Sequence, residues 1–389
     1  MHRTRSILLA ACALLLAADP SSAVESKIGP AGQVILDGTP VVPVGVWVQP
    51  PYLFEYHRQL GATCIVSPAR ERGDFADSAS DVYAAAQRTS MGLIVQSGRR
   101  RSDHPNVWGY IASYMDPRRI DQVGRDRAHL RQADPNRFMM VNIAIDEFIV
   151  GDHEAAYTEG LRSTDAVISH VWPELRDPTT ANLRNVALFI DRVRRYCHGR
   201  EGGEVSIWVE LNPHPWKLKD QQGGTAFPSP TREEVRFQIW LALIHGADAI
   251  VIFPITFDPF VYSQIPALNE KEIAANAALI KRMTPALTAG ESALPITITS
   301  DQPDGIIDRT TRDLDGTHYI FVLNGGRDPQ TLTLAVPGLG DRWMLVDAVT
   351  DQPLAAPEGT HSERLDGLAL RIWKLQARPP HEPSARGDQ

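Results

Sequence analysis

TREEVRFQIWLALIHGADAIVIFPITF, residues 231–257, contains one complete helix-to-strand unit. Thr231 and Glu234 have the spacing of a capping box, which opens a helix, and Gly246 is suited to ending one. The run ADAIVIF that follows is apolar without alternation, as in a strand buried on both faces of a parallel sheet. This stretch therefore predicts an amphipathic helix packed beside a buried parallel strand.

Seven more runs of this kind precede it, each followed by polar or aromatic residues and then by helical spacing. The eight runs are VVPVGVWV (41–48), ATCIVSP (62–68), MGLIVQS (91–97), VWGYIAS (107–113), FMMVNIAI (138–145), DAVISHVWP (165–173), SIWVELNP (206–213) and ADAIVIFPITF (247–257). Eight such alternations match the size of a (β/α)8 TIM barrel, an α/β fold. A doubly wound open sheet is the alternative, but no GxGxxG loop follows any run, so its dinucleotide-binding form has no support.

After the segment KRMTPALTAGESALP the pattern changes to alternating runs separated by Gly, Pro and Asp turns. These runs are ITITS (296–300), GIIDRTT (305–311), THYIFVLNGG (317–326), QTLTLAVPG (330–338), RWMLVDAV (342–349) and LALRIWKLQ (368–376). They predict a small antiparallel β-sandwich domain. The expected organisation is a signal peptide over 1–23, a barrel over 24–290, a sandwich over 291–376 and a disordered tail over 377–389.

The amino terminus predicts export. MHRTR is basic, SILLAACALLLAA is apolar but too short to span a bilayer, and small residues follow it. We expect a periplasmic or extracellular protein without a membrane span; a lipoprotein modified at Cys12 is the less favoured alternative. The net charge of -8, without a basic stripe, argues against nucleic acid as a partner. Cys64 and Cys197 are read as two free thiols or one bridge. The sequence leaves the oligomeric state open.

Functional groups in a barrel of this kind project from the carboxyl ends of the strands. The predicted strand ends are rich in aromatic rings and carboxylates, which suits a carbohydrate cleft, because sugar rings pack on aromatic faces and hydroxyls need hydrogen-bonding partners. The candidate sugar-binding residues are Trp47, Tyr114, Asp146, Glu147, His170, Trp172, His214, Trp216 and Asp258.

Two carboxyl groups on different strands meet the demand of glycoside hydrolysis. One carboxylic acid must protonate the leaving oxygen, while a carboxylate attacks the sugar or activates water. Asp116 at the end of the fourth strand and Glu210 at the end of the seventh are the candidate catalytic pair. A separation of about 5 Å would predict retention of configuration and about 6.5–9.5 Å inversion.

Several stretches resemble the clan A type of glycoside hydrolase. They are IGPAGQVILDGTPVVPVGVWVQPPYLFEYHRQLGATCIV (28–66), HPNVWGYIASYMDP (104–117), RQADPNRFMMVNI (131–143), TREEVRFQIWLALIHGADAIVIF (231–253) and YIFVLNGGRDPQTLTLAVPG (319–338). The resemblance covers most of residues 28–376 and implies a TIM barrel with a C-terminal sandwich that cleaves a poly- or oligosaccharide. It implies that Glu210 is the nucleophile.

The second stretch is similar to the family's fourth strand, HPxxxGWYLxDEP, whose Glu is the acid/base. Counted from Gly109, that position falls on Tyr114 or Met115, whereas counted back from Pro117 it falls on Asp116. One extra residue, as in a bulge at the strand end, reconciles the two alignments. Asp116 is then the proton donor that the resemblance implies, with a side chain one methylene shorter.

Structural alternatives stay open for these residues. Asp116 could cap a helix before Pro117, Glu210 could be an ion-paired strand-end residue, and His170 and His214 could hold structure or orient a carboxylate. One of Asp146 and Glu147 is the reserve acid, since neighbouring strand residues face opposite sides. No cofactor or metal is expected, because HxH, HExxH and GxSxG motifs do not occur. A noncatalytic carbohydrate-binding barrel, and a purely structural exported protein, are the competing functions.

Overall fold

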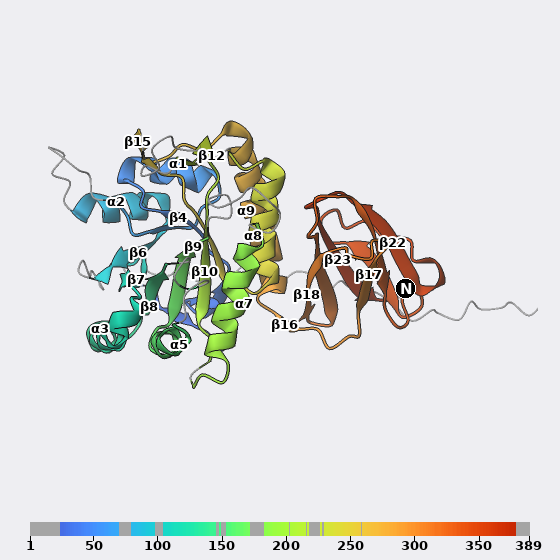
Figure 1. Ribbon diagram of the computed structural model, residues 1–389, viewed down its shortest axis with the longest axis horizontal. Coiled ribbons are helices and arrows are strands. Elements are labelled where there is room, and N and C mark those ends of the chain that lie inside the picture. Colours follow the sequence, from blue (N-terminus) through green and yellow to red (C-terminus); the bar gives the residue numbers. More distant parts are fainter. Residues whose placement is uncertain are drawn as a thin grey trace, which may run out of the picture.

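The computed structural model describes residues 24–378, apart from 70–78, 98–103, 145–147, 149–152, 172–182, 202, 215, 218–225, 228 and 258. The predicted signal peptide lies outside the described residues, as does the predicted tail beyond residue 378. The described chain forms a barrel followed by two antiparallel sheets (Figure 1). No described helix is both long enough and apolar enough to cross a membrane.

Eight parallel strands close into a barrel, so the predicted fold class is confirmed. They are β4 (Val44–Trp47), β5 (Cys64–Val66), β6 (Gly92–Gln96), β7 (Val107–Tyr114), β8 (Phe138–Ile143), β9 (Ala166–His170), β10 (Ser206–Leu211) and β13 (Ala249–Ile252). All eight lie within the predicted runs or one residue beyond them. The open-sheet alternative is excluded, because β13 pairs with both β10 and β4.

Alternate residues of each strand pack into two different cores. Met140, Ile168 and Trp208 belong to a cluster inside the barrel. Their neighbours in sequence, such as Val141 and Val209, belong to a larger cluster between the barrel and its helices. Both faces of the strands are thus covered, which explains the continuous apolar runs.

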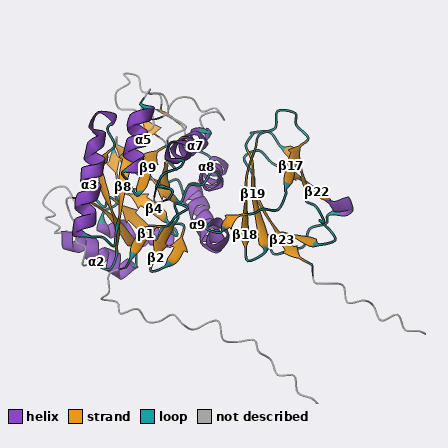
Figure 2. Ribbon diagram, turned by 90° about the horizontal axis from the view of Figure 1, so that it is seen from below, coloured by secondary structure: helices purple, strands orange, loops and turns teal. Residues whose placement is uncertain are grey.

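Helices surround the strands (Figure 2). They are α1 (Phe54–Gln59), α2 (Ala79–Thr89), α3 (Ile120–Ala133), α5 (Glu154–Arg162), α7 (Asn185–Cys197), α8 (Arg232–Ile244) and α9 (Ala267–Leu287), with short 3-10 turns η1 (Pro51–Leu53) and η3 (Pro117–Arg119). The predicted capping box at α8 is confirmed: Thr231 Oγ1 accepts from Glu234 N at 3.2 Å, and Thr231 N donates to Glu234 Oε2 at 2.9 Å.

A three-stranded antiparallel sheet, β1 (Ser26–Ile28), β2 (Val34–Leu36) and β3 (Thr39–Val41), precedes the barrel. Val34 is fully buried in the cluster inside the barrel, and Ile28, Leu36 and Val41 pack against it. Ser26 N bonds Asn136 O just before β8 begins. The sheet therefore covers the end at which the barrel strands start. Two short hairpins lie at the other end: β11 (Trp216–Lys217) with β12 (Ala226–Phe227), and β14 (Thr256–Phe257) with β15 (Phe260–Val261).

The C-terminal part is a two-sheet sandwich, as predicted. One sheet has the order β16-β18-β19-β23-β21 and the other β17-β20-β22, with an apolar cluster that draws on both. The strands are β16 (Gly290–Glu291), β17 (Thr297–Ser300), β18 (Ile307–Leu314), β19 (Thr317–Asn324), β20 (Gln330–Ala335), β21 (Trp343–Asp347), β22 (Thr360–Leu365) and β23 (Leu370–Ala377), with a 3-10 turn η5 (Pro357–Gly359). The sequence patterns missed β22, whose residues THSERL bury only Leu365 because it is an edge strand.

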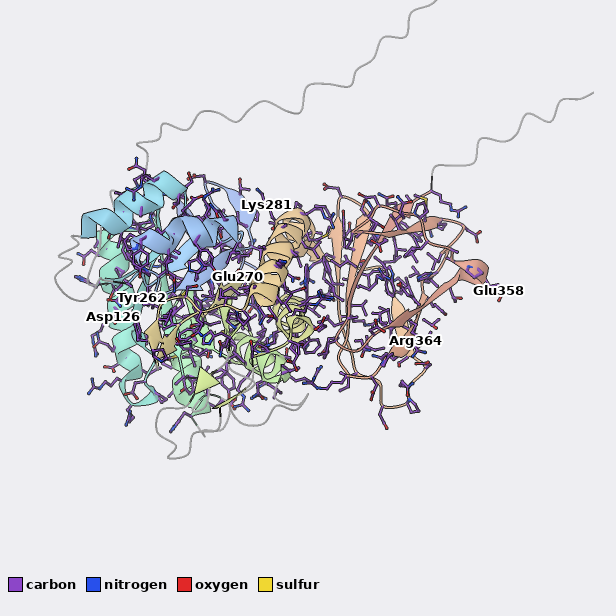
Figure 3. The ribbon with its side chains drawn as sticks, turned by 90° about the horizontal axis from the view of Figure 1, so that it is seen from above. Asp126, Tyr262, Glu270, Lys281, Glu358 and Arg364 are labelled. Atoms are coloured by element: carbon purple, nitrogen blue, oxygen red, sulfur yellow. The ribbon has the colours of Figure 1, made fainter. Side chains whose placement is uncertain are left out.

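The sandwich packs against the helices of the barrel. In Figure 1 it lies beside α7, α8 and α9, and Figure 3 shows Glu270 and Lys281 along α9, with Glu358 at the far end of the sandwich. The Trp240 ring of α8 stacks on Phe321 of β19, with ring centroids 6.0 Å apart. Both residues belong to the large barrel–helix cluster, so one apolar core continues across the two parts.

A partly buried ion cluster, centred on the buried Asp308, joins the two parts beside this core. Asp308 of β18 accepts two hydrogen bonds from the Arg184 guanidinium, at 2.6 and 2.7 Å, and lies 3.0 Å from His245 Nε2. The other ring nitrogen of His245 lies 2.8 Å from Asp191 Oδ1. Burial opposes the charged imidazole, but the two carboxylate contacts outweigh it and raise the pKa of His245 to about 9.

We expect His245 to make stability fall at alkaline pH. Its folded pKa of about 9 lies above the ordinary value of 6.5, so its contribution is complete below pH 6.5 and is lost as the pH rises through about 9. Because Asp191 is more than half exposed, we expect about 2 kcal/mol. Urea unfolding across this range should show the decline in wild type and in the exposed control His198→Gln, and a flatter profile in His245→Gln. Equal slopes in all three would contradict the assignment.

Both cysteines that the structure describes are free and buried. Burial raises the pKa of Cys64 to about 12 and that of Cys197 to about 11. Of the two readings of the cysteines, the free thiols are correct. Neither forms a thiolate near neutral pH, so neither is suited to redox or nucleophilic chemistry.

Candidate functional site at the mouth of the barrel

Glu210 lies inside the barrel near the carboxyl end of β10. Trp208, two residues earlier, belongs to the interior cluster, so Glu210 shares its inward face. Its side chain has no exposed surface, and its Oε1 lies 2.7 Å from Nδ1 of His170. Among the described residues, Oε2 has no hydrogen-bond partner. A buried carboxyl oxygen without a partner is costly, and such atoms are typical of sites that receive a ligand or a proton.

His170 is the partner of Glu210 in the strand register. The two residues pair across β9 and β10, and their side chains point to the same interior. Trp47 meets the imidazole edge-on at 5.4 Å, and Phe253 does so at 5.2 Å. The side chain of His170 keeps 17% of its surface exposed, whereas Glu210 keeps none. His170 therefore connects the buried carboxyl to the solvent-facing side of the mouth.

Two more side chains complete this layer. His214, in the segment after β10, is buried, and its ring stacks on Phe253 with centroids 6.5 Å apart. Asn142 of β8 is also buried, and its Oδ1 has no hydrogen-bond partner among the described residues. The sequence reasoning missed Asn142 and Phe253. Asn142 carried a usable signal, because it is the only polar residue of FMMVNIAI and follows Met140 at the spacing of an inward face.

The strand that precedes Asp116 contains the predicted extra residue. Ile111 of β7 pairs with Met140 of β8, but the next pair joins Tyr114 to Asn142, so three steps on β7 match two on β8. This is the register shift of a β-bulge. The bulge inferred from the displaced acidic residue is thus confirmed, and it brings Asp116 two residues beyond the position that pairs with Asn142.

Asp116 itself caps the 3-10 turn η3. Its Oδ1 accepts from Arg118 N and Arg118 Nε, both at 2.9 Å, and its Oδ2 accepts from the same guanidinium at 3.1 Å. The Arg118 side chain, then its backbone N–H, holds the pKa of Asp116 below its usual range. These contacts are those of the capping alternative. The proton-donor role of Asp116 stays a prediction.

The two candidate carboxyl groups are therefore tuned in opposite directions. Burial raises the pKa of Glu210, and His170 only partly offsets it. Asp116 is held ionised by an exposed arginine. Opposite pKa shifts are what distinguish the acid from the base in a catalytic pair of carboxyl groups. The raised pKa favours Glu210 over Asp116 as the carboxyl group that carries a proton, whereas the resemblance assigned proton donation to Asp116.

The remaining predicted binding residues divide into three groups. Trp47, His170 and His214 are described and gather around Glu210, the latter two through Phe253. For Tyr114 and Trp216 only the backbone is described, at the end of β7 and in β11. Asp146, Glu147, Trp172 and Asp258 lie outside the described residues. Sugar binding by each of these residues stays a prediction.

The barrel and sandwich are similar to solved structures of glycoside hydrolases. One named "Glycoside hydrolase" is 10% identical, with a TM-score of 0.55 over 90% of this chain and 96% of that one. A noncanonic maltogenic alpha-amylase from Thermotoga neapolitana is 12% identical, with a TM-score of 0.53 over 86% and 98%. An alpha-glucosyl transfer enzyme is also 12% identical, with a TM-score of 0.53 over 86% of this chain and 99% of that one. No family model and no curated protein matches the chain.

These similarities extend over nearly the whole length of each solved chain, barrel and sandwich together. The fold that the resemblance implied is therefore confirmed: the chain has the two-part architecture of the amylase type of glycoside hydrolase. At 10–12% identity the likeness establishes the fold alone. The activity must be argued from the site.

Proposed function

We propose that the protein is an exported glycoside hydrolase whose reaction centre contains Glu210. The observation that carries the proposal is the fully buried carboxyl group of Glu210, which is paired with His170 and has one oxygen without a partner among the described residues. It lies at the carboxyl end of a barrel strand, where TIM-barrel enzymes place their catalytic groups. Burial raises the pKa of Glu210 above its usual value, the direction that enzymes use to tune a carboxyl group for proton transfer.

The surroundings of Glu210 support a sugar as the substrate. Trp47 and Phe253 supply apolar rings, and His170 and Asn142 supply hydrogen-bonding groups in the same layer. Sugars need both kinds of contact. The structural neighbours include AmyP in complex with maltose, 10% identical with a TM-score of 0.52. Malto-oligosaccharides are therefore the first substrates to test, within a panel that also contains β-linked glucans and xylans.

The test is the release of reducing ends from this panel by the purified mature protein. Cleavage that disappears in Glu210→Gln supports the proposal. Binding of a glycan without cleavage, measured by calorimetry, would replace it by the second function below. Proton NMR of the first product would then assign the anomeric configuration. Retention implies a carboxyl separation of about 5 Å and inversion about 6.5–9.5 Å.

Asp116 is proposed as the second carboxyl group, and Asp116→Asn tests it cleanly. Asparagine caps helices as well as aspartate does, so the substitution should leave the melting temperature unchanged. It removes the ionisable group, so we expect glycan cleavage to fall about 10²–10⁴-fold. Arg118→Gln is the matched variant, because it removes the arginine that lowers the pKa of Asp116; it should move upward whichever limb of the pH–rate profile Asp116 controls, the alkaline limb for a proton donor and the acidic limb for a base. Unchanged cleavage in Asp116→Asn would leave Asp116 as a cap only.

The second candidate function is a noncatalytic carbohydrate-binding barrel. Two observations favour it: Glu210 has no exposed surface, and the hydrogen bonds of the Asp116 carboxylate among the described residues all go to Arg118. In that case Trp47 and His170 would bind a glycan that is not cut. Trp47→Ala should then weaken glycan binding while Glu210→Gln should not.

A further inference from the structure

A recess lined by arginines lies at the opposite end of the barrel from Glu210. It has a volume of about 110 Å³. A single water needs only about 10–15 Å³ of such space. The lining comes from β1, the second half of α3, the start of β8 and the segments before β9 and β10. The lining residues are Ser26, Lys27, Ile28, Arg127, Arg131, Pro135, Arg137, Phe138, Asp165, Arg200 and Glu204.

The lining carries a large excess of positive charge. Five of its side chains are cationic, and only Asp165 and Glu204 are acidic. Asp165 is already engaged: its Oδ1 accepts from Arg127 at 2.7 Å and Arg131 at 2.9 Å, and its Oδ2 accepts from Met139 N at 3.0 Å. It has little capacity left for the other two arginines.

Those two arginines have buried nitrogens without partners. Arg137 is only 6% exposed, and among the described residues its Nε and Nη2 have no hydrogen-bond partner; its Nη1 bonds Asn136 O at 2.9 Å. The Nε of Arg200 is likewise buried and without a partner, while its Nη2 bonds Thr164 O at 2.6 Å. Burial, together with repulsion from Arg127, lowers the pKa of Arg200. Buried guanidinium nitrogens without acceptors are strongly destabilising unless an anion completes them.

We propose that this recess is a binding site for a small tetrahedral oxyanion, phosphate or sulfate, held by Arg137 and Arg200. The planar guanidinium matches two oxygens of such an anion at once. The volume admits one ion of this size and no sugar polymer. The bound ion would connect β1, α3 and the segment after α7, which all line the recess. It would act as a stabilising ligand, separate from the chemistry at the mouth.

The test compares melting temperatures in sodium phosphate, sodium sulfate and sodium chloride at matched ionic strength. Wild type should melt higher in phosphate or sulfate than in chloride, with a rise that grows with anion concentration. Arg137→Met keeps the apolar stem and removes the buried charge. In chloride it should melt at or above wild type, and in phosphate below it. A purely structural arginine would make the variant melt lower in both salts.

Arg162→Met, at an exposed position of α5, is the matched control and should respond to phosphate as wild type does. Isothermal titration with sodium phosphate should show affinity at least about tenfold weaker in Arg137→Met. Should that variant fail to fold, Arg200→Gln serves instead, because it removes the other guanidinium group that is proposed to hold the anion. The proposal is overturned if neither anion stabilises wild type beyond chloride, or if the recess variants bind as wild type does.

Discussion

Glu210→Gln is expected to lower glycan cleavage by roughly 10³-fold or more, because the amide keeps the shape of the carboxyl group but cannot exchange a proton or attack. The same substitution should not destabilise the fold. Burial makes an ionised Glu210 costly, and a neutral amide can still accept a hydrogen bond from His170. We therefore expect a melting temperature at or above that of wild type. Initial rates of reducing-end release and calorimetric melting of the same preparations measure both effects.

Two outcomes would point elsewhere. A Glu210→Gln protein that cleaves at the wild-type rate would remove Glu210 from the mechanism. A variant that loses activity together with several degrees of melting temperature would identify Glu210 as the structural member of an ion pair with His170. Glu159→Gln, on the exposed face of α5, has the same change of charge and should alter neither quantity.

Asp308→Ala is expected to cost about 3–5 kcal/mol of stability, the largest effect we predict for a residue outside the mouth. The Asp308 side chain is 5% exposed, and its removal leaves the Arg184 guanidinium and the His245 imidazole facing a void. Both cations would then lose the carboxylate that offsets their burial. Differential scanning calorimetry should show a lower melting temperature. The alkaline decline in stability that is assigned to His245 should also become smaller in this variant.

Asp304→Ala is the matched control, because Asp304 is an exposed acidic residue of the same domain. Its melting temperature should stay close to that of wild type. If Asp308→Ala also melts within a degree or so of wild type, the ion cluster contributes nothing net to the joining of barrel and sandwich. The apolar contact of Trp240 with Phe321 would then be what holds the barrel and the sandwich together.

The fold could be predicted from the sequence because each barrel strand is buried on both faces. Runs such as ADAIVIF and FMMVNIAI are almost wholly apolar, and that pattern leaves few alternatives once it recurs eight times. The capping box at Thr231 is a local signal and was equally readable. The strand β22 could not be read, because an edge strand with five polar residues has no periodic apolar face.

The site was readable in part. Glu210 and His170 could be found separately as polar residues at strand ends, but their contact depends on the register between β9 and β10, which no single run contains. The bulge in β7 was detectable only because the spacing from Gly109 to Pro117 was one residue too long. The pairing of Asp116 with Arg118 was not foreseen, since short-range side-chain contacts at a turn compete closely with water.

The position of Trp240 sets a limit on how the protein can be divided. Its indole is fully buried, with one face on Phe321 of the sandwich and its N–H on Asn276 of α9. In a chain truncated after α9, that indole and its apolar neighbours on α8 would form a solvent-exposed hydrophobic patch. We expect such a fragment to precipitate or to recruit chaperones when it is expressed alone. Chimeric proteins built from this chain should therefore include the barrel and the sandwich together.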